Sequence, residues 1–214
     1  MMIELLILAS TLSAPAGDEK PLFEERFDGR LAPGWEWVRE DKDEWRIREN
    51  TLEVHSQFGR IWGGNDAKNL LLAKKVKPEN LAAVVRVAHE PKEKWEQAGL
   101  LWYVDDDNFV KLISEQIDGK MYVVAAREIK GRGKVVGKVV APVVNVELRL
   151  KVESKRVTGQ WRVKKGDKWS DSGACDFDVP GNARFGLFTQ NGPKEGVRWV
   201  RFDDFAIREL PKGP

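Results

Sequence analysis

The chain is poor in the residues from which metal sites and many catalytic sites are built. Its 214 residues include one cysteine, Cys175, and two histidines, His55 and His89. A lone cysteine excludes an intramolecular disulfide and a cysteine-cluster metal site. The histidines lie too far apart in sequence for H-x-x-x-H or an equivalent zinc spacing. Cys175 lies in the Gly/Asp-rich segment SDSGACD, which we interpret as a loop, and no histidine is near enough in sequence to favour a catalytic thiol.

An excess of charge of one sign is also missing. The 36 basic and 34 acidic side chains nearly cancel and are scattered along the chain. A nucleic-acid binder has a basic stripe or patch, so we predict no nucleic-acid partner. The sequence contains no P-loop, no G-x-S-x-G and no G-x-G-x-x-G after a strand, so these motifs do not suggest nucleotide binding or serine catalysis.

Long hydrophobic runs are absent, and the apolar stretch at residues 5–12 is too short to span a membrane. Small residues at 14–16 follow it, as at the cleavage site of a secretory signal peptide, although the segment carries Glu4 and no basic residue. We predict a signal peptide over residues 1–16 and a single β-sandwich domain over 17–214. The protein would be secreted or periplasmic, and not transmembrane after cleavage. The alternative is a buried N-terminal segment of a cytoplasmic protein.

The most informative stretch is QAGLLWYV-DDDN-FVKLISE, from Gln97 to Glu115. Two apolar segments flank an acidic turn at Asp105–Asn108, which is the pattern of a β-hairpin. The first segment is apolar on both faces, and such a strand lies centrally in a layered β structure.

Other segments alternate between apolar and polar residues, as Val146–Glu153 does, and none shows long helical periodicity. Regular short strands separated by turn residues predict an all-β, two-sheet antiparallel sandwich of the jelly-roll type. The candidate strands are Leu22–Phe27, Trp35–Val38, Glu44–Arg48, Thr51–His55, Asn69–Val76, Ala82–His89, Gln97–Val104, Phe109–Gln116, Met121–Ile129, Val135–Val140, Val146–Glu153, Arg156–Lys164, Ala183–Thr189 and Gly196–Ile207.

Nine tryptophans suggest either core packing or a stacking platform for sugar rings. Lys111 and Glu115 share a strand face, opposite Val110 and Leu112. We expect them to form a carbohydrate site with other residues on one curved sheet. The alternative for Glu115 is a charge paired across the sheet. The candidate carbohydrate-binding residues are Trp102, Lys111, Glu115, Arg127, Gln190 and Asn191.

Acidic residues allow two further hypotheses. Glycoside hydrolysis needs two carboxylates about 5 to 10 Å apart, and no strand carries such a pair next to Glu115, so a catalytic pair would have to be assembled across strands. Asp28 lies near the start of the chain and Asp203–Asp204 near its end. Pairing of the terminal strands would bring these aspartates together as a structural Ca²⁺ site; the alternative is two solvated turns or bulges.

Several motifs together resemble a known family. The chain looks like the concanavalin A-like β-sandwich at the C-terminus of family-43 β-xylosidases, and is similar to a related stand-alone domain of unknown function once linked to regulation of enolase. The resemblance implies a jelly roll without the hydrolytic domain of those enzymes. The motifs that carry it are FEERFDG, GWEWVREDKDEWRIRENTLEV, NLLLAKKV, QAGLLWYVDDDNFVKLISE, RFGLFTQN and VRFDDFAIREL.

The wider superfamily contains glycanases with an E-x-D-x-x-E strand motif, which this sequence lacks, and lectins with a structural calcium. We therefore expect an exported, non-catalytic domain that binds a poly- or oligosaccharide. The alternatives are a structural or protein-interaction domain of the cell envelope, and a glycoside hydrolase with carboxylates assembled across strands.

Overall fold

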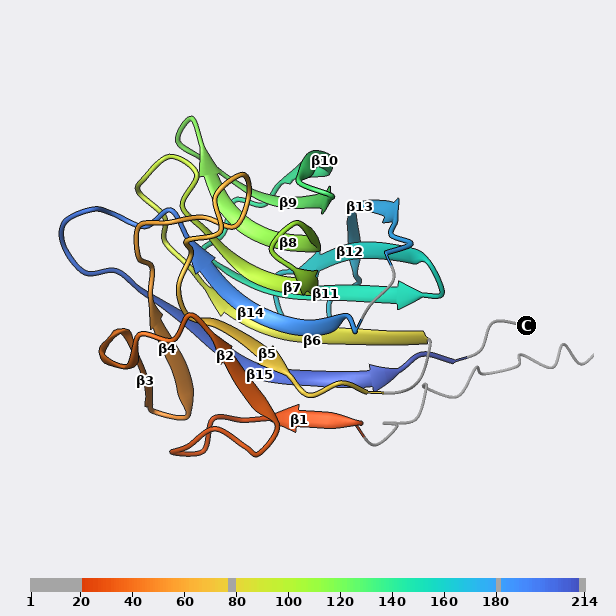
Figure 1. The fold of residues 1–214 in the computed structure, drawn as a ribbon, viewed down its shortest axis with the longest axis horizontal. Coiled ribbons are helices and arrows are strands. Elements are labelled where there is room, and N and C mark those ends of the chain that lie inside the picture. Colours follow the sequence, from red (N-terminus) through yellow and green to blue (C-terminus); the bar gives the residue numbers. More distant parts are fainter. Residues whose placement is uncertain (1–20, 77–79, 180–181, 212–214) are drawn as a thin grey trace, which may run out of the picture.

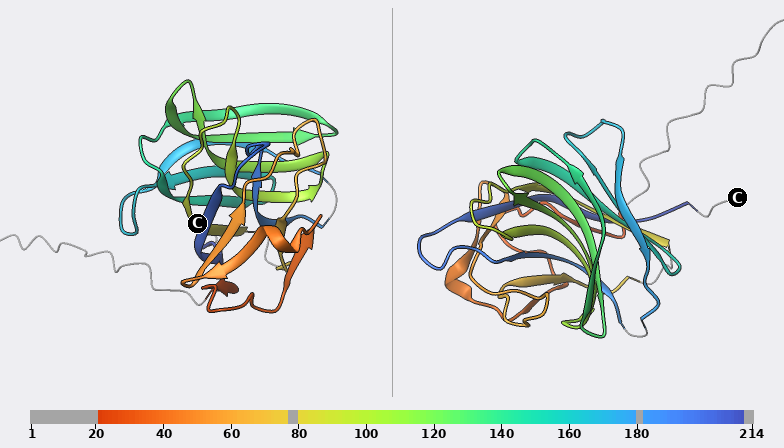
Figure 2. Two further views of the ribbon diagram at one scale, coloured as in Figure 1. Left: turned by 90° about the vertical axis from the view of Figure 1, so that its left-hand side faces the viewer. Right: turned by 90° about the horizontal axis from the view of Figure 1, so that it is seen from above.

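The structure, a computed structural model, describes residues 21–76, 80–179 and 182–211 (Figure 1). The expected signal peptide at 1–16 lies outside these ranges. Within them the chain forms β-strands and a single 3-10 turn, Lys42–Glu44, with no α-helix. No helix in this part of the chain is long and apolar enough to cross a membrane. The strands form two antiparallel sheets packed face to face (Figure 2), so the predicted fold class is confirmed.

The eight-stranded sheet has the order β13-β12-β11-β6-β15-β4-β3, and β1 also pairs with β15. The first and last strands therefore pair, with Glu25 opposite Phe205. Its strands are β1 (Phe23–Glu25), β3 (Trp45–Arg48), β4 (Thr51–His55), β6 (Asn80–Ala88), β11 (Asn145–Glu153), β12 (Arg156–Arg162), β13 (Ser170–Asp176) and β15 (Trp199–Glu209).

The seven-stranded sheet has the order β10-β9-β8-β7-β14-β5-β2. The doubly apolar strand β7 lies between β8 and β14, and β7 and β8 form the predicted hairpin across the acidic turn. Its strands are β2 (Trp35–Val38), β5 (Leu70–Ala73), β7 (Gln97–Asp105), β8 (Asn108–Ile117), β9 (Lys120–Ile129), β10 (Arg132–Val140) and β14 (Arg184–Gln190).

The main core fills the space between the sheets, with Leu100 and Leu112 of one sheet and Leu150 and Phe202 of the other fully buried. A second apolar cluster lies on the outer face of the seven-stranded sheet, the face turned away from the other sheet. Residues 56–69, which we call the covering loop, contribute Ile61 and Ala67 to it. This loop explains how β7 can be apolar on both faces.

One predicted loop is a strand. Ser170–Asp176 forms β13 and pairs with β12, with Cys175 opposite Val157. Cys175 is buried in the main core, and burial raises the pKa of its thiol. The segment is rich in residues that disfavour strands, but tertiary pairing and packing override such local preferences. The interpretation of SDSGACD as a loop was therefore wrong.

Candidate functional site

Four polar side chains lie together on the outer face of the seven-stranded sheet. Strand pairing places Gln97 of β7 opposite both Glu115 of β8 and Gln190 of β14. Lys111 lies four positions before Glu115, on the same face of β8. All four residues are at most 6% exposed. Buried polar side chains are unfavourable unless they are hydrogen-bonded, so their partners define the site.

Gln97 is the centre of this polar network. Its Nε2 donates to Glu115 Oε2 at 2.5 Å, and its Oε1 accepts from Lys111 Nζ at 2.8 Å and from Gln190 Nε2 at 2.7 Å. The two charged residues are thus joined through a neutral amide. In the part of the chain that the structure describes, Lys111 makes no direct ion pair with a carboxylate.

Burial changes the protonation of both charged residues. It lowers the pKa of Lys111 to about 7, although the charges of Glu115 and Glu128 oppose this change. Burial also raises the pKa of Glu115, against the effects of Gln97 and Lys111. In both cases desolvation of the charged form is the dominant cause. Titratable groups perturbed in this way are more frequent at functional sites than elsewhere.

The covering loop closes over one side of the network. Its Ile61 N–H donates to Gln190 Oε1 at 3.1 Å, and the half-buried Trp62 ring lies 4.7 Å from Lys111 Nζ. Trp62 also lies against the backbone of Gly133, where an added Cβ would be 2.1 Å from Trp62 Cε2. Only glycine at this position of β10 allows the indole so close to the strand.

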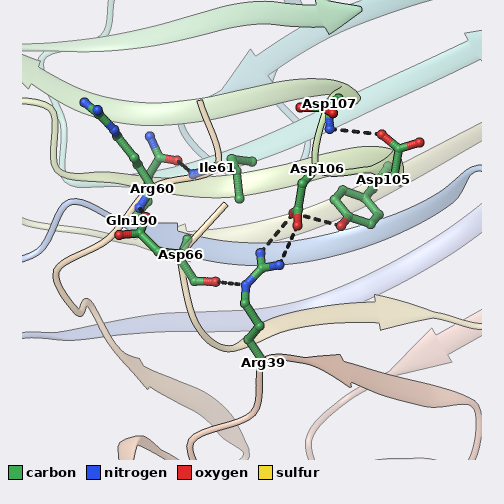
Figure 3. A network of polar contacts seen from close by, with 10 residues as sticks. Arg39, Arg60, Ile61, Asp66, Asp105, Asp106, Asp107 and Gln190 are labelled. Carbon is green, nitrogen blue, oxygen red and sulfur yellow. Dashed lines mark hydrogen bonds and ion pairs between the residues drawn. The ribbon is translucent and has the colours of Figure 1, made fainter. Parts of the chain in front are cut away.

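Arg39 holds the covering loop to the β7–β8 hairpin (Figure 3). It binds Asp106 with two hydrogen bonds, of 2.6 and 3.0 Å, and its Nε donates to the Ala67 carbonyl at 2.6 Å. Tyr103 Oη also donates to Asp106, at 2.9 Å. The acidic turn of the hairpin is therefore a structural anchor for the loop.

Two predicted site residues lie on the other face of the same sheet. Trp102 is opposite Val110, and its ring packs 4.6 Å from that of Phe185, against the main core. Arg127 is also opposite Val110 and donates to the Asp176 carbonyl at 2.6 Å. The structure does not bring Trp102 or Arg127 together with Lys111 and Glu115, because strand alternation points them to the inner face.

Asn191 lies at the end of β14, beside the network. Its Nδ2 donates to the Trp95 carbonyl at 3.0 Å and its N–H to the Gly59 carbonyl at 2.7 Å. It therefore joins two loops at this end of the sandwich. Of the six predicted carbohydrate-binding residues, the structure brings together Lys111, Glu115 and Gln190, with Asn191 next to them.

The carboxylates on this face are too far apart for glycoside hydrolysis as a pair. Glu115 is opposite Tyr122, whereas Glu128 is opposite Phe109, six positions away along β8. At about 3.3 Å per residue, this offset separates the two backbone positions by about 20 Å. Hydrolytic pairs need about 5 to 10 Å. Glu115 and Glu128 therefore do not form the cross-strand catalytic pair that the sequence left open.

The aspartates considered for calcium are not arranged as a site. Asp28 is exposed in the loop after β1, and Asp203 and Asp204 lie where the pairing of β15 with β6 shifts register. Across residues 21–76, 80–179 and 182–211, no three His, Cys, Asp or Glu side chains gather closely enough to hold a metal ion. Calcium takes six to eight oxygen ligands, including backbone carbonyls and waters, so these aspartates alone do not form such a site and Ca²⁺ binding stays a prediction.

A different carboxylate organises the region near Asp28. Glu25 is buried and accepts from the N–H groups of Phe27 at 2.7 Å and Ala32 at 2.6 Å, and from Trp35 Nε1 at 2.9 Å. These donors satisfy both carboxylate oxygens. It therefore holds the loop after β1 by hydrogen bonds.

Gln97 and Trp62 are members of the site that sequence reasoning missed. Gln97 begins an apolar strand, and its partners depend on a strand order that local patterns do not reveal. The covering loop did leave a signal: Ile61 and Trp62 are flanked by the turn-forming residues Gly59 and 63–66. An apolar pair between such turns indicates a loop that packs onto the protein.

The family model and the similar solved structures both point to β-xylosidases. Residues 24–208 match the model of the β-xylosidase C-terminal concanavalin A-like domain. The GH43 protein BlXynB from Bacillus licheniformis has a TM-score of 0.79 at 21% identity, over 94% of this chain and 41% of that one. A xylan β-1,4-xylosidase from Bacillus halodurans has a TM-score of 0.76 at 16% identity, over 94% and 41%. This chain thus spans about two fifths of those proteins.

A functionally unknown protein from Saccharomyces cerevisiae has a TM-score of 0.63 at 19% identity, over 84% of this chain and 98% of that one. A search of curated proteins found no match. At these identities the likeness to solved structures concerns the fold alone.

Proposed function

The chain belongs to the family of concanavalin A-like domains found at the C-terminus of β-xylosidases, and from this premise we propose that it is a non-catalytic module that binds carbohydrate. The observation that carries the proposal is the buried polar network of Gln97, Lys111, Glu115 and Gln190 on the outer face of the seven-stranded sheet. A network of this kind is costly in an otherwise apolar layer, which favours a role in recognition.

Half-buried aromatic residues border the network and supply the surfaces on which a sugar ring stacks. Trp62 lies over Lys111, and Tyr122 is the cross-strand neighbour of Glu115. Lys138 lies 4.9 Å from the Tyr122 ring and adds a donor beside it. Sites for small ligands combine such apolar walls with a few fixed polar groups. In this proposal, Tyr122 and Trp62 stack on the glycan, and Glu115 and Lys138 bind its hydroxyls.

A glycan array, probed with the folded protein with and without added calcium, tests this proposal. Tyr122→Ala should weaken binding to the neutral glycans that the parent retains, whereas Trp161→Phe, on the other sheet, should leave it unchanged. Circular dichroism of each variant checks the fold. If the folded parent binds no glycan, or if Tyr122→Ala binds as the parent does, this face is not a carbohydrate site. Loss of binding without calcium would support the metal expected from the sequence.

Export remains a second part of the proposal, and it rests on residues 1–16 of the sequence. A glycan-binding module meets polysaccharide outside the cytoplasm. Expression of the full chain in a host with an export pathway, followed by mass measurement of the protein, tests this point. A mass that retains residues 1–16 in the cytoplasmic fraction would contradict export.

A protein-interaction role is the second candidate, and exposed apolar loop residues favour it. Phe58, Trp95 and Val197 are 58%, 49% and 67% exposed, on three loops at one end of the sandwich. Hydrogen bonds join these loops: Ser56 N–H donates to the Arg198 carbonyl at 2.8 Å, and Asn191 Nδ2 donates to that of Trp95. Exposed apolar patches often mark protein contacts.

Sedimentation velocity across a range of protein concentrations tests this second role for self-association. The double substitution Phe58→Ser and Val197→Ser should abolish any concentration-dependent association of the parent. A parent that stays monomeric at all concentrations would exclude a homomeric contact through these loops.

A further inference from the structure

The outer face of the eight-stranded sheet carries a groove of about 880 Å³. Its floor consists of the small residues Ala82, Val84 and Ala206 on β6 and β15. Longer side chains of β11 and β12 stand on one side, and those of β15 and β1 stand on the other. The volume lies within the range of about 300 to 1,000 Å³ that is usual for ligand sites.

One wall of the groove combines an indole with two guanidinium groups. Arg149 Cζ and Arg162 Cζ each lie 4.2 Å from the ring of Trp169, which also lines the groove. Arg149 Nε donates to Gln160 Oε1 at 2.8 Å, which fixes the plane of that guanidinium. The wall is thus preorganised: the aromatic ring and both cations are held before any ligand arrives.

This wall carries more positive than negative charge. The buried Glu147 is shared between Arg162, which forms a short hydrogen bond to it, and Arg86, at 3.8 Å. Arg149 has no ion pair with a carboxylate among the residues in the described ranges. Burial and the nearby Arg162 lower the pKa of Arg149 to about 10. Asp171 and Glu153 oppose this change. An anion placed beside Arg149 would relieve the repulsion from Arg162 and supply a charged acceptor.

The opposite wall offers acceptors. Glu24, Asp204 and Glu209 line it, and all three are exposed; Arg208 of β15 also lines the groove. Carboxylates accept hydrogen bonds from hydroxyl groups. They repel any negatively charged group of a ligand that lies beside this wall. A ligand that suits both walls carries a carboxylate at one end and neutral hydroxyls at the other, with a ring that stacks on Trp169.

We propose that this groove binds an acidic oligosaccharide, with a uronic acid carboxylate at Arg149 and Arg162 and neighbouring sugar hydroxyls at Glu24 and Asp204. The site is on the opposite side of the sandwich from the Gln97 network. It therefore goes beyond the proposed function and does not depend on that network binding sugar.

Isothermal titration with three probes tests the proposal: an aldotetraouronic acid, which has one uronic acid on a neutral trisaccharide; the neutral xylotetraose; and free glucuronic acid. We expect the aldotetraouronic acid to bind at least about tenfold more tightly than either of the others, because only it reaches both walls. Arg149→Gln should weaken its binding about tenfold or more, and Trp169→Ala should do the same.

Matched controls separate this site from general charge and from the other sheet. Lys155→Gln removes an exposed cation in the turn between β11 and β12, which pairs with Asp178, and should leave affinity unchanged. Arg46→Gln removes a half-exposed arginine of the same sheet that does not line the groove, and should also leave it unchanged. Absence of binding, equal binding of acidic and neutral tetrasaccharides, or an affinity unaffected by Arg149→Gln would overturn the proposal. Equal losses in Arg149→Gln and Lys155→Gln would also overturn it, since they indicate nonspecific attraction. Loss of affinity in Tyr122→Ala, with none in Arg149→Gln, would place the ligand on the other sheet and overturn the proposal.

Discussion

The outer faces of the two sheets bury carboxylates in different ways. On the eight-stranded sheet, Glu53 lies between Arg46 at 2.5 Å and Arg201 at 3.1 Å, and these arginine side chains are 44% and 57% exposed. On the seven-stranded sheet, Glu115 is bound by the neutral amide of Gln97, and the nearest cation of its network, Lys111, is fully buried. One face neutralises its acids directly at the surface, while the other keeps opposite charges apart in the interior.

The two arrangements have different costs in folding stability. Arginine that is half in water neutralises a carboxylate at little desolvation cost, and a second arginine makes the pair redundant. A buried lysine without a direct ion pair loses its hydration and gains only one amide hydrogen bond. Its burial therefore lowers the free energy of unfolding. Because the Gln97 network lowers stability, its presence is best explained by a function.

The largest effect should come from removing the acid of each face. At about pH 6, Glu115→Ala should lower the free energy of unfolding by about 3–5 kcal/mol, because it leaves the buried Lys111 charge uncompensated. Glu53→Ala should lower it by only about 1.5 kcal/mol, because Arg46 and Arg201, which it leaves without this acid, retain contact with water. Urea denaturation of both variants measures the difference. Equal losses of unfolding free energy in the two variants would show that the two faces do not differ in how they stabilise buried acids.

The pH dependence of stability should report the buried lysine. The pKa of Lys111 is 10.5 in its ordinary state and about 7 in the folded chain, so the unfolded chain binds more protons between these values. Stability contributed by this residue therefore rises with pH across that window, by at most about 1.4 kcal/mol per pH unit. Below the folded pKa, both states are protonated and the penalty is constant.

Lys111→Met should abolish this rise, which urea denaturation at several pH values can follow in both proteins. A parent whose stability is flat from neutral to alkaline pH, or a variant with the same slope, would contradict the buried charge.

Displacing the indole that covers the network should have a smaller effect. Gly133→Ala introduces a Cβ 2.1 Å from Trp62 Cε2, and such overpacking costs about 1–3 kcal/mol. The ring should move off Lys111, so quenching of tryptophan fluorescence by acrylamide should increase. Lys134→Ala, at the next and exposed position of the same strand, is the control. Unchanged quenching and stability would show that Trp62 does not depend on this contact.

The smallest effect should come from the redundant pair on the other face. Arg46→Ala leaves Glu53 bound to Arg201 at 3.1 Å, so the loss should be below about 1 kcal/mol. Thermal denaturation of Arg46→Ala and Glu115→Ala under the same conditions compares the two losses of stability. A loss as large as that of Glu115→Ala would mean that the second arginine is no substitute.

Local patterns in the sequence predicted most strands and the shared face of Lys111 and Glu115, because alternation depends only on neighbouring residues. They did not predict that Gln97 and Gln190 meet, since this requires β14 to lie beside β7 although 93 positions separate the two glutamines. Trp102 was predicted as a site residue because tryptophan stacks on sugars. Strand alternation, however, puts Trp102 on the inner face of β7, against the core. β13 was missed because its residues favour turns, and only pairing with β12 makes it a strand.

The bidentate contact of Arg39 with Asp106, together with its hydrogen bond to Ala67, has a consequence for motion. The tip of the β7–β8 hairpin and the covering loop share one clamp, so neither can separate from the sheet without breaking it. Their backbone amides should then exchange with solvent as one cooperative unit. Access to Lys111 would be governed by the free energy of opening that unit, and a ligand that needs this lysine would have to select the rare open state.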